Sequence, residues 1–294
     1  MRRLIPDQVS VSGLASPSMM IYCWGMRIAL LLLAACFTSA TAHAACEYRP
    51  EWRARDVATY VTDAETCLTE LKDGYWFDEA VEREVFDRVN SARADAGLEP
   101  LAVRQALLRP ARLHSFDMGQ DMFFSHDGPD GRSVSDRVSA LDRTLVHSEL
   151  RENIATIGGA FNWSDAGEIL HNILYNSDGH RENMLSPRLT HMAIGVVRTE
   201  DGAWITQVFA RVEGEFNRDV PAAFSQGGAL PSVTMADWRF SETLLENDGQ
   251  EHRLSLLDPM LRGEARLLVV GTRAIDDFSY QTIKLAGPSI TLAD

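Results

Sequence analysis

The hydrophobic residues of this chain change their spacing near Pro187, and this change constrains the fold most strongly. Before it, Val81, Val85 and Val89 recur at the spacing of one helical face. After it, residues 192–197 and 203–210 show the two-residue alternation of strands, and Asp201-Gly202 between them favours a β-hairpin. Helices followed by a small antiparallel sheet predict the α+β class.

Three helical stretches are predicted before the hairpin. The first begins at Asp78 and ends at Gly97, and the third is capped by Ser164 or Asp165. Pro110 lies inside the second stretch, so that helix either begins near it or kinks there. Residues 123–137 carry turn chemistry. The second helix is expected to place five residues on one face: Leu107, Ala111, His114, Met118 and Met122.

The first 44 residues are predicted to be a signal peptide region. Arg27 precedes a short apolar run, and Ala42-His43-Ala44 follows it as a small-x-small cleavage pattern. The apolar run is too short to span a bilayer, so no transmembrane span is expected. The pattern predicts a secreted or periplasmic protein. The alternative is a lipid anchor at Cys36, because Leu33-Ala34-Ala35-Cys36 is similar to a bacterial lipobox.

Cleavage after Ala44 would leave two cysteines, Cys46 and Cys67. Two cysteines in an exported chain are expected to pair, which makes residues 45–77 a disulfide-stapled segment. Such a bond closes a loop of about 20 residues, worth about 3 kcal/mol in the chain-entropy model. The alternative is two free buried thiols.

The composition changes again near residue 214. A linker-like run is followed by short strand-like segments that Asp-Pro, glycine and Asp-Asp turns interrupt. We therefore expect one mixed domain of helices and strands over 78–213 and a separate small all-β domain over 214–294. The formal net charge of −14 argues against a nucleic-acid partner, which would select a basic surface.

Three residues of the central segment are candidates for chemistry: His126, Glu152 and His180. Two imidazoles and a carboxylate can ligate a divalent metal such as zinc, or exchange protons near neutral pH. More than twenty residues separate each from the next, so their spacing does not force them together. His114 lies on an apolar helix face and is read as a hydrogen-bonded core residue. Asn153 and Asn183 are expected to hold loops.

The order of several motifs makes the central segment recognisable. VFDRVNSARADAGLEPL, ARLHSFDM, FFSHDGPDGRS, ENIA, NSDGHRENML and WITQVFA follow one another. Together they resemble the bacterial branch of the CAP superfamily, which includes cysteine-rich secretory, antigen-five and pathogenesis-related proteins. The resemblance covers roughly Asp78–Arg211. It implies that the domain over 78–213 is a CAP-like α-β-α sandwich with a cleft lined by histidines and acidic residues.

Carried over residue by residue, the resemblance implies that His126, Glu152 and His180 line this cleft. Ser177 stands near the place where eukaryotic members have a second glutamate, which weakens the charge balance for a metal. Arg151 replaces the glycine usual before ENIA, and its cation would lower the pKa of Glu152 if the two side chains meet.

The leading hypothesis is an exported binding module whose cleft takes a divalent metal or a small ligand. Its partner would be a small molecule, a lipid or a cell-surface component. One alternative is a metal-dependent hydrolase of peptide or cell-envelope bonds. The other is a structural domain in which the His/Glu set only ties loops together. The sequence leaves open whether the protein is an enzyme.

Overall fold

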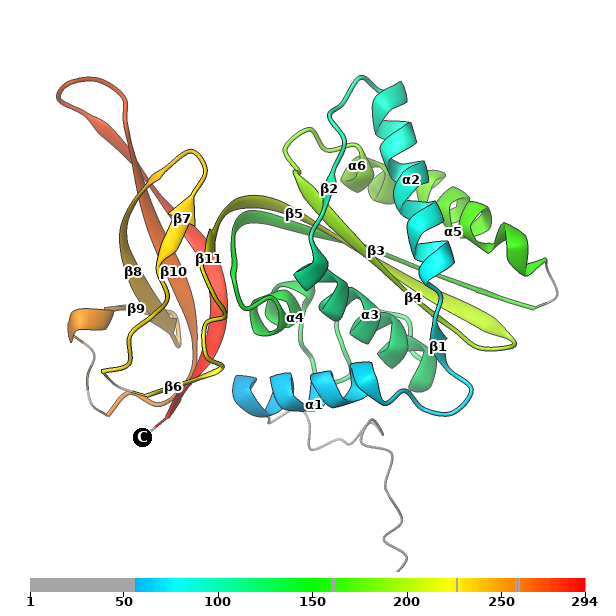
Figure 1. The fold of residues 1–294 in the computed structure, drawn as a ribbon, viewed down its shortest axis with the longest axis horizontal. Helices are drawn as coiled ribbons and strands as arrows, with labels where there is room; N and C mark the ends of the chain where they lie inside the picture. Colours follow the sequence, from blue (N-terminus) through cyan, green and yellow to red (C-terminus); the bar gives the residue numbers. More distant parts are fainter. Residues whose placement is uncertain (1–55, 160–161, 226, 257, 259, 294) are drawn as a thin grey trace, which may run out of the picture. The chain divides into compact units, whose positions relative to one another are not determined.

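The computed structural model describes residues 56–293 except 160–161, 226, 257 and 259. The predicted signal peptide region, Cys36 and Cys46 lie outside the described residues. The helices, shown in Figure 1, are α1 (Val57–Thr69), α2 (Glu79–Asp95), α3 (Gln105–Gln120), α4 (Val134–Leu141), α5 (Ala166–Tyr175) and α6 (Asp178–Met184), with 3-10 turns at Trp163–Asp165 and Leu254–Leu256.

The strands form one sheet in the order β1-β4-β5-β3-β11-β10-β8-β9. Three short strands attach to this path, with β2 beside β4, β6 beside β11 and β7 beside β5. Their bounds are β1 (Trp76–Phe77), β2 (Ala102–Val103), β3 (Leu145–Gly158), β4 (His191–Arg198), β5 (Gly202–Phe216), β6 (Ala223–Ser225), β7 (Val233–Met235), β8 (Arg239–Asn247), β9 (Gln250–Arg253), β10 (Gly263–Ala274) and β11 (Tyr280–Ala293).

Strand β4 shows why the central segment forms a three-layer sandwich. Met192, Ile194 and Val196 face a core that α2, α5 and α6 share, whereas Ala193 and Val197 face cores built with α1, α3 and α4. Because successive strand residues point to opposite faces, an apolar strand buries both faces only between two helical layers. The antiparallel β4–β5 pair confirms the predicted hairpin, and helices lie on both of its faces in Figure 1.

The predicted helix ends are confirmed in part. Asp78 caps α2 through a hydrogen bond from the Val81 amide, and Gly97 has a φ of +70° just after the helix. Pro110 lies inside α3, which begins five residues earlier. The expectation for Met122 is wrong: α3 ends at Gln120, and Met122 is 80% exposed with a φ of +52°.

Two local predictions need correction. Residues 134–137 were expected in a turn but begin α4, because Ser133 and Asp136 form a capping box there. Asp165 occupies the N-cap position of α5 without a side-chain cap bond, while Asn162 caps the 3-10 turn before it.

The C-terminal region contains the expected antiparallel sheet, with β10 between β8 and β11. Its own core includes Leu245, Leu267, Leu285 and Ile290. Tyr280–Ala293 forms one strand of 14 residues, β11, which is longer than the short segments expected there. The predicted boundary between residues 213 and 214 falls inside β5, which continues to Phe216 and pairs with β7. A strand therefore connects the two regions at this position.

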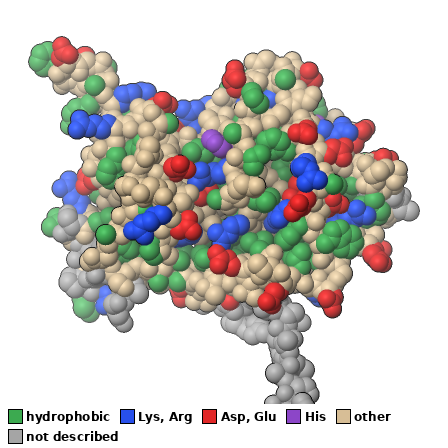
Figure 2. All heavy atoms as spheres, viewed as in Figure 1, with side chains coloured by type: hydrophobic (Ala, Val, Ile, Leu, Met, Phe, Trp, Pro, Cys, Tyr) green, Lys and Arg blue, Asp and Glu red, His purple; other side chains and the backbone are tan. Residues whose placement is uncertain are grey.

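The surface in Figure 2 intermingles acidic and basic side chains on the face shown. The end of the β10–β11 hairpin exposes the apolar residues Ile275, Phe278 and Tyr280. Within the described part of the chain, no helix is both long and apolar enough to cross a membrane. Cys67 is buried on α1, and its predicted pairing with Cys46 stays a prediction.

Candidate functional site

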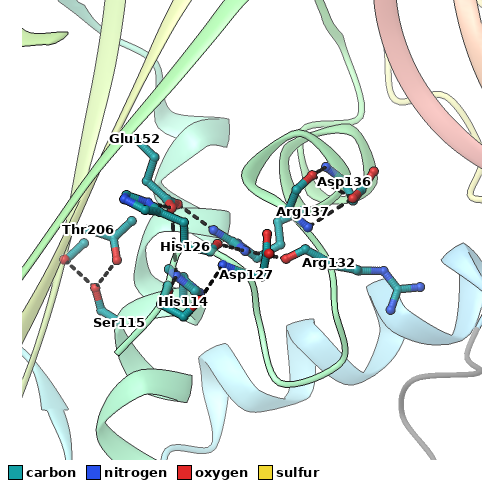
Figure 3. A network of polar contacts seen from close by, with 12 residues as sticks. His114, Ser115, His126, Asp127, Arg132, Asp136, Arg137, Glu152 and Thr206 are labelled. Carbon is teal, nitrogen blue, oxygen red and sulfur yellow. Dashed lines mark hydrogen bonds and ion pairs between the residues drawn. The ribbon is translucent and has the colours of Figure 1, made fainter. Parts of the chain in front are cut away.

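His126 and Glu152, which the family resemblance places in one cleft, are in direct contact. His126 lies on the loop between α3 and α4, and its Nδ1 is 2.9 Å from Oε1 of Glu152 on β3 (Figure 3). The Glu152 side chain is only 2% exposed, whereas that of His126 is 55% exposed. The hydrogen bond to Glu152 raises the pKa of His126 above its ordinary value of 6.5. The pair therefore presents an oriented imidazole to solvent.

Arg137 contacts both residues of this pair, and sequence reasoning did not single it out. It reaches from α4 to donate a 2.6 Å bond from Nη2 to Oε2 of Glu152, and a 2.9 Å bond from Nη1 to the carbonyl of His126 (Figure 3). Burial alone would raise the pKa of Glu152, but the His126 hydrogen bond and the Arg137 charge outweigh burial and lower it. Glu152 is therefore held as a carboxylate.

The condition for an effect of Arg151 on Glu152 is not met, because the Arg151 side chain bonds other partners. It donates to Glu149 at 2.6 Å and to the Asn183 amide oxygen at 3.0 Å. Adjacent strand residues face opposite sides of the sheet, so Arg151 and Glu152 diverge. The cation that stabilises Glu152 is Arg137 on α4, and its place in a stretch expected to form a turn gave no signal of this role.

His180 is tied to the same strand through its backbone. The side-chain amide of Asn153 donates to the His180 carbonyl at 3.0 Å, and that of Asn183 donates to the Asn153 side-chain oxygen at 2.8 Å. Both asparagines bond backbone groups as expected, but they join helix α6 to strand β3 rather than hold a loop. Burial, followed by the nearby charge of His126, lowers the pKa of His180.

The ring of His180 carries one further feature. Its Nδ1 is buried and makes no hydrogen bond to any protein atom in the described ranges. Buried polar atoms without a partner are uncommon in proteins and often mark the place of a ligand, an ion or a water molecule. His180 is therefore open to an additional contact that the protein itself does not supply.

Strand β3 explains how residues distant in sequence approach one another. On its outer side β3 pairs with β11 at a single position, His147 opposite Ala286. The loop that carries His126 belongs to the helical layer of α3 and α4, whereas His180 lies on α6 in the other layer. The two histidines thus come from opposite layers around the edge of β3.

The sequence singles out two further residues, His114 as a core residue and Ser177 as a neighbour of the cleft. His114 is fully buried, and its Nε2 lies 2.9 Å from the carbonyl oxygen of Ser125, so the core reading is confirmed. Burial, with a smaller effect of Arg137, lowers the pKa of His114 to about 4. Ser177 is the N-cap residue of α6, and its side chain makes no bond to His126, Glu152 or His180 in the described structure.

Both carboxylate oxygens of Glu152 already have protein partners. One oxygen of Glu152 contacts His126 and the other contacts Arg137. Among the described residues, no three His, Cys, Asp or Glu side chains are arranged to hold a metal ion. Glu152 instead has the place of a carboxylate that orients a ligand histidine through its second ring nitrogen.

The fold and the site define a sandwich protein with a His–Glu pair at the edge of its sheet. Residues 86–209 match the family model described as "CAP: Cysteine-rich secretory protein family". This match supports the predicted resemblance of the central segment to the bacterial branch of the CAP superfamily.

Two curated relatives from Bacillus subtilis (strain 168) match over 130 residues, 44% of this chain. "Uncharacterized protein YkwD" is 32% identical over 47% of its own length. "Uncharacterized membrane protein YlbC" is 31% identical over 34% of its length. The match thus spans less than half of each of these relatives.

Solved structures with some similarity include an extracellular protein containing a SCP domain from Bacillus anthracis str. Ames. It is 28% identical with a TM-score of 0.39, over 49% of this chain and 42% of its own. An outer surface protein from Borrelia burgdorferi is 15% identical with a TM-score of 0.39, over 46% of this chain and 94% of its own.

Proposed function

We propose that the protein is an exported binding module that takes a divalent metal such as zinc between His126 and His180. The observation that carries the proposal is the buried Nδ1 of His180, which has no hydrogen-bond partner among the described residues and belongs to a ring whose pKa is lowered by burial and then by the charge of the exposed His126. Glu152 would act as the positioning residue, because its bond to Nδ1 leaves Nε2 of His126 as the ligand atom. A resident metal would supply a Lewis-acidic centre at the edge of β3.

Calorimetric titration with zinc tests this proposal. The wild type is expected to bind one ion, and the double variant His126→Ala/His180→Ala is expected to lose at least about tenfold in affinity, since it removes both imidazoles. His252→Ala is the matched control. It removes a half-buried histidine on β9, which β11, β10 and β8 separate from β3 in the strand order. Equal zinc binding by the wild type and the double variant would remove the metal site.

A structural role is the second candidate, because Asn153 and Asn183 join the His180 backbone to β3. In that case His180→Ala would lower the melting temperature strongly, and zinc would raise it in neither protein. In the proposed case zinc raises the melting temperature of the wild type only, because a ligand that binds the folded state stabilises it.

A hydrolase acting on peptide or cell-envelope bonds is favoured by one observation. The environments push the pKa values of His126 and His180 apart, as an acid–base pair requires. Hydrolysis by the zinc-loaded wild type, absent in the double variant, would establish this activity.

Export itself belongs to the proposal. We infer cleavage after Ala44, followed by pairing of Cys46 with Cys67. Mass spectrometry of the mature protein is expected to find Ala45 first and two hydrogens fewer than the reduced mass. A lipid-modified Cys36 at the N-terminus would contradict cleavage after Ala44.

A further inference from the structure

A second hollow lies at the other end of the β3–β5 pair from the junction with β11. It encloses about 460 Å³, a volume in the range of small-molecule sites. None of its lining residues belongs to the His126 site. The residues used below are Tyr75, Thr156, Thr199, Asp201 and Trp204, with Met122 at the rim.

Missing side chains create this hollow. Gly158 and Gly202 are cross-strand partners, and the next pair on the same face is Thr156 with Trp204. A Cβ at Gly119 would lie 2.9 Å from Cε3 of Trp204, so the indole ring covers the last turn of α3 at van der Waals distance. A Cβ at Gly202 would lie 3.4 Å from Cη2 of Trp204, so the lack of side chains at the two strand glycines leaves room beside this ring.

The hydroxyl groups of the lining already donate their protons. The Tyr75 hydroxyl donates to the Gly119 carbonyl at 3.2 Å, and the Thr156 hydroxyl donates to the Ala203 carbonyl at 3.0 Å. The Thr199 hydroxyl donates to the Gly202 carbonyl at 3.4 Å. The Thr199 oxygen also accepts from the backbone amides of Asp201 and Gly202, at 3.3 and 3.1 Å, so both of its lone pairs are used. The Tyr75 and Thr156 hydroxyls can therefore only accept further hydrogen bonds, and the indole N–H of Trp204 is the donor that remains among the lining side chains.

The lining carries one charge. Asp201 is exposed at the β4–β5 turn, and its carboxylate makes no ion pair or hydrogen bond within the described part of the chain. An acceptor-rich wall, two aromatic rings and a free carboxylate complement a cation that carries N–H donors. A saccharide would find few hydrogen-bond donors in this lining. An anion would be repelled by the carboxylate of Asp201 and by the net charge of −14.

We propose that this hollow binds an alkylammonium group, in which the N–H donors meet Asp201 and the Thr156 hydroxyl oxygen while the alkyl chain lies against Trp204 and Met122. The group comes either from a free amine or from a lysine side chain of a partner. The proposal is independent of metal binding at His126 and His180.

NMR titration with n-butylammonium tests the proposal, with n-butanol as the neutral analogue. We expect millimolar binding of the cation that shifts the Trp204 indole signal, and weaker binding of n-butanol. Asp201→Asn is expected to weaken cation binding about fivefold, the upper worth of an exposed ion pair. Glu200→Gln, the adjacent carboxylate of the same turn outside the lining, is expected to leave it unchanged.

Three results would overturn the proposal: binding of n-butanol as tight as that of the cation, full binding by a folded Asp201→Asn variant, or tighter binding of maltose. A tripeptide with lysine between two glycines separates the sources. Tighter binding of the tripeptide than of n-butylammonium assigns the site to a partner's lysine, and equal or weaker binding assigns it to a free amine.

Discussion

Replacing Arg137 with methionine is expected to lower the free energy of unfolding by about 3–5 kcal/mol, since removal of one partner strands a buried charge. Glu152 is 2% exposed and would lose the guanidinium that holds its second oxygen. The carbonyls of His126 and Arg132 would lose their donor as well. Denaturant unfolding at neutral pH measures the change.

Arg188→Met is the matched control, because Arg188 also pairs with a glutamate of β3, Glu149, but is 65% exposed. The Arg188→Met substitution is expected to lower the free energy of unfolding by less than about 1 kcal/mol. The double variant Arg137→Met/Glu152→Gln is expected to recover part of the stability lost in Arg137→Met, because it removes the stranded charge. A cost of Arg137→Met no larger than that of Arg188→Met would show that the pair does not organise the site.

Acid is expected to destabilise the protein through His147, which lies on β3 opposite β11. Both of its ring nitrogens are buried and without a hydrogen-bond partner in the described residues. Burial, with a smaller effect of Arg266, lowers its pKa from 6.5 to about 4, against the opposing effect of Asp142. The unfolded chain therefore binds more protons below pH 6.5, and stability falls as the pH drops from 6.5 toward 4.

The size of this effect follows from the same shift. At pH 4 the lowered pKa of His147 is expected to reduce the free energy of unfolding by about 3 kcal/mol relative to neutral pH. His147→Leu is expected to remove that part of the acid loss, while His252→Leu is expected to retain it. Unfolding free energies at both pH values provide the measurement. An unchanged acid loss in His147→Leu would mean that this ring is not held neutral in the fold.

Local sequence signals predicted the elements that depend on neighbours along the chain. The spacing of Val81, Val85 and Val89 located α2, and Asp201-Gly202 located the β4–β5 hairpin. The prediction that Met122 lies on the helix face is wrong because α3 ends at Gln120, although the apolar spacing continues to Met122. Helix ends depend on the structure that follows them as well as on periodicity.

The candidate site came from the resemblance, because no local rule brings His126, Glu152 and His180 together. Folding places them by long-range pairing of β3 with β5 and by the packing of α6 on the far face. Arg137 shows the limit of sequence reading. A buried arginine that neutralises a distant glutamate has no local signature, since its partner is chosen by the packing of α4 against β3.

The most direct test of the central claim, that His126 and His180 share one site at the edge of β3, is the pKa of His180 measured by NMR in the wild type and in His126→Ala. The wild-type His126 should titrate above 6.5 and His180 below it. Removing His126 should raise the pKa of His180, because the charge of a nearby imidazolium is lost. An unchanged His180 pKa in a folded His126→Ala variant would contradict the shared site.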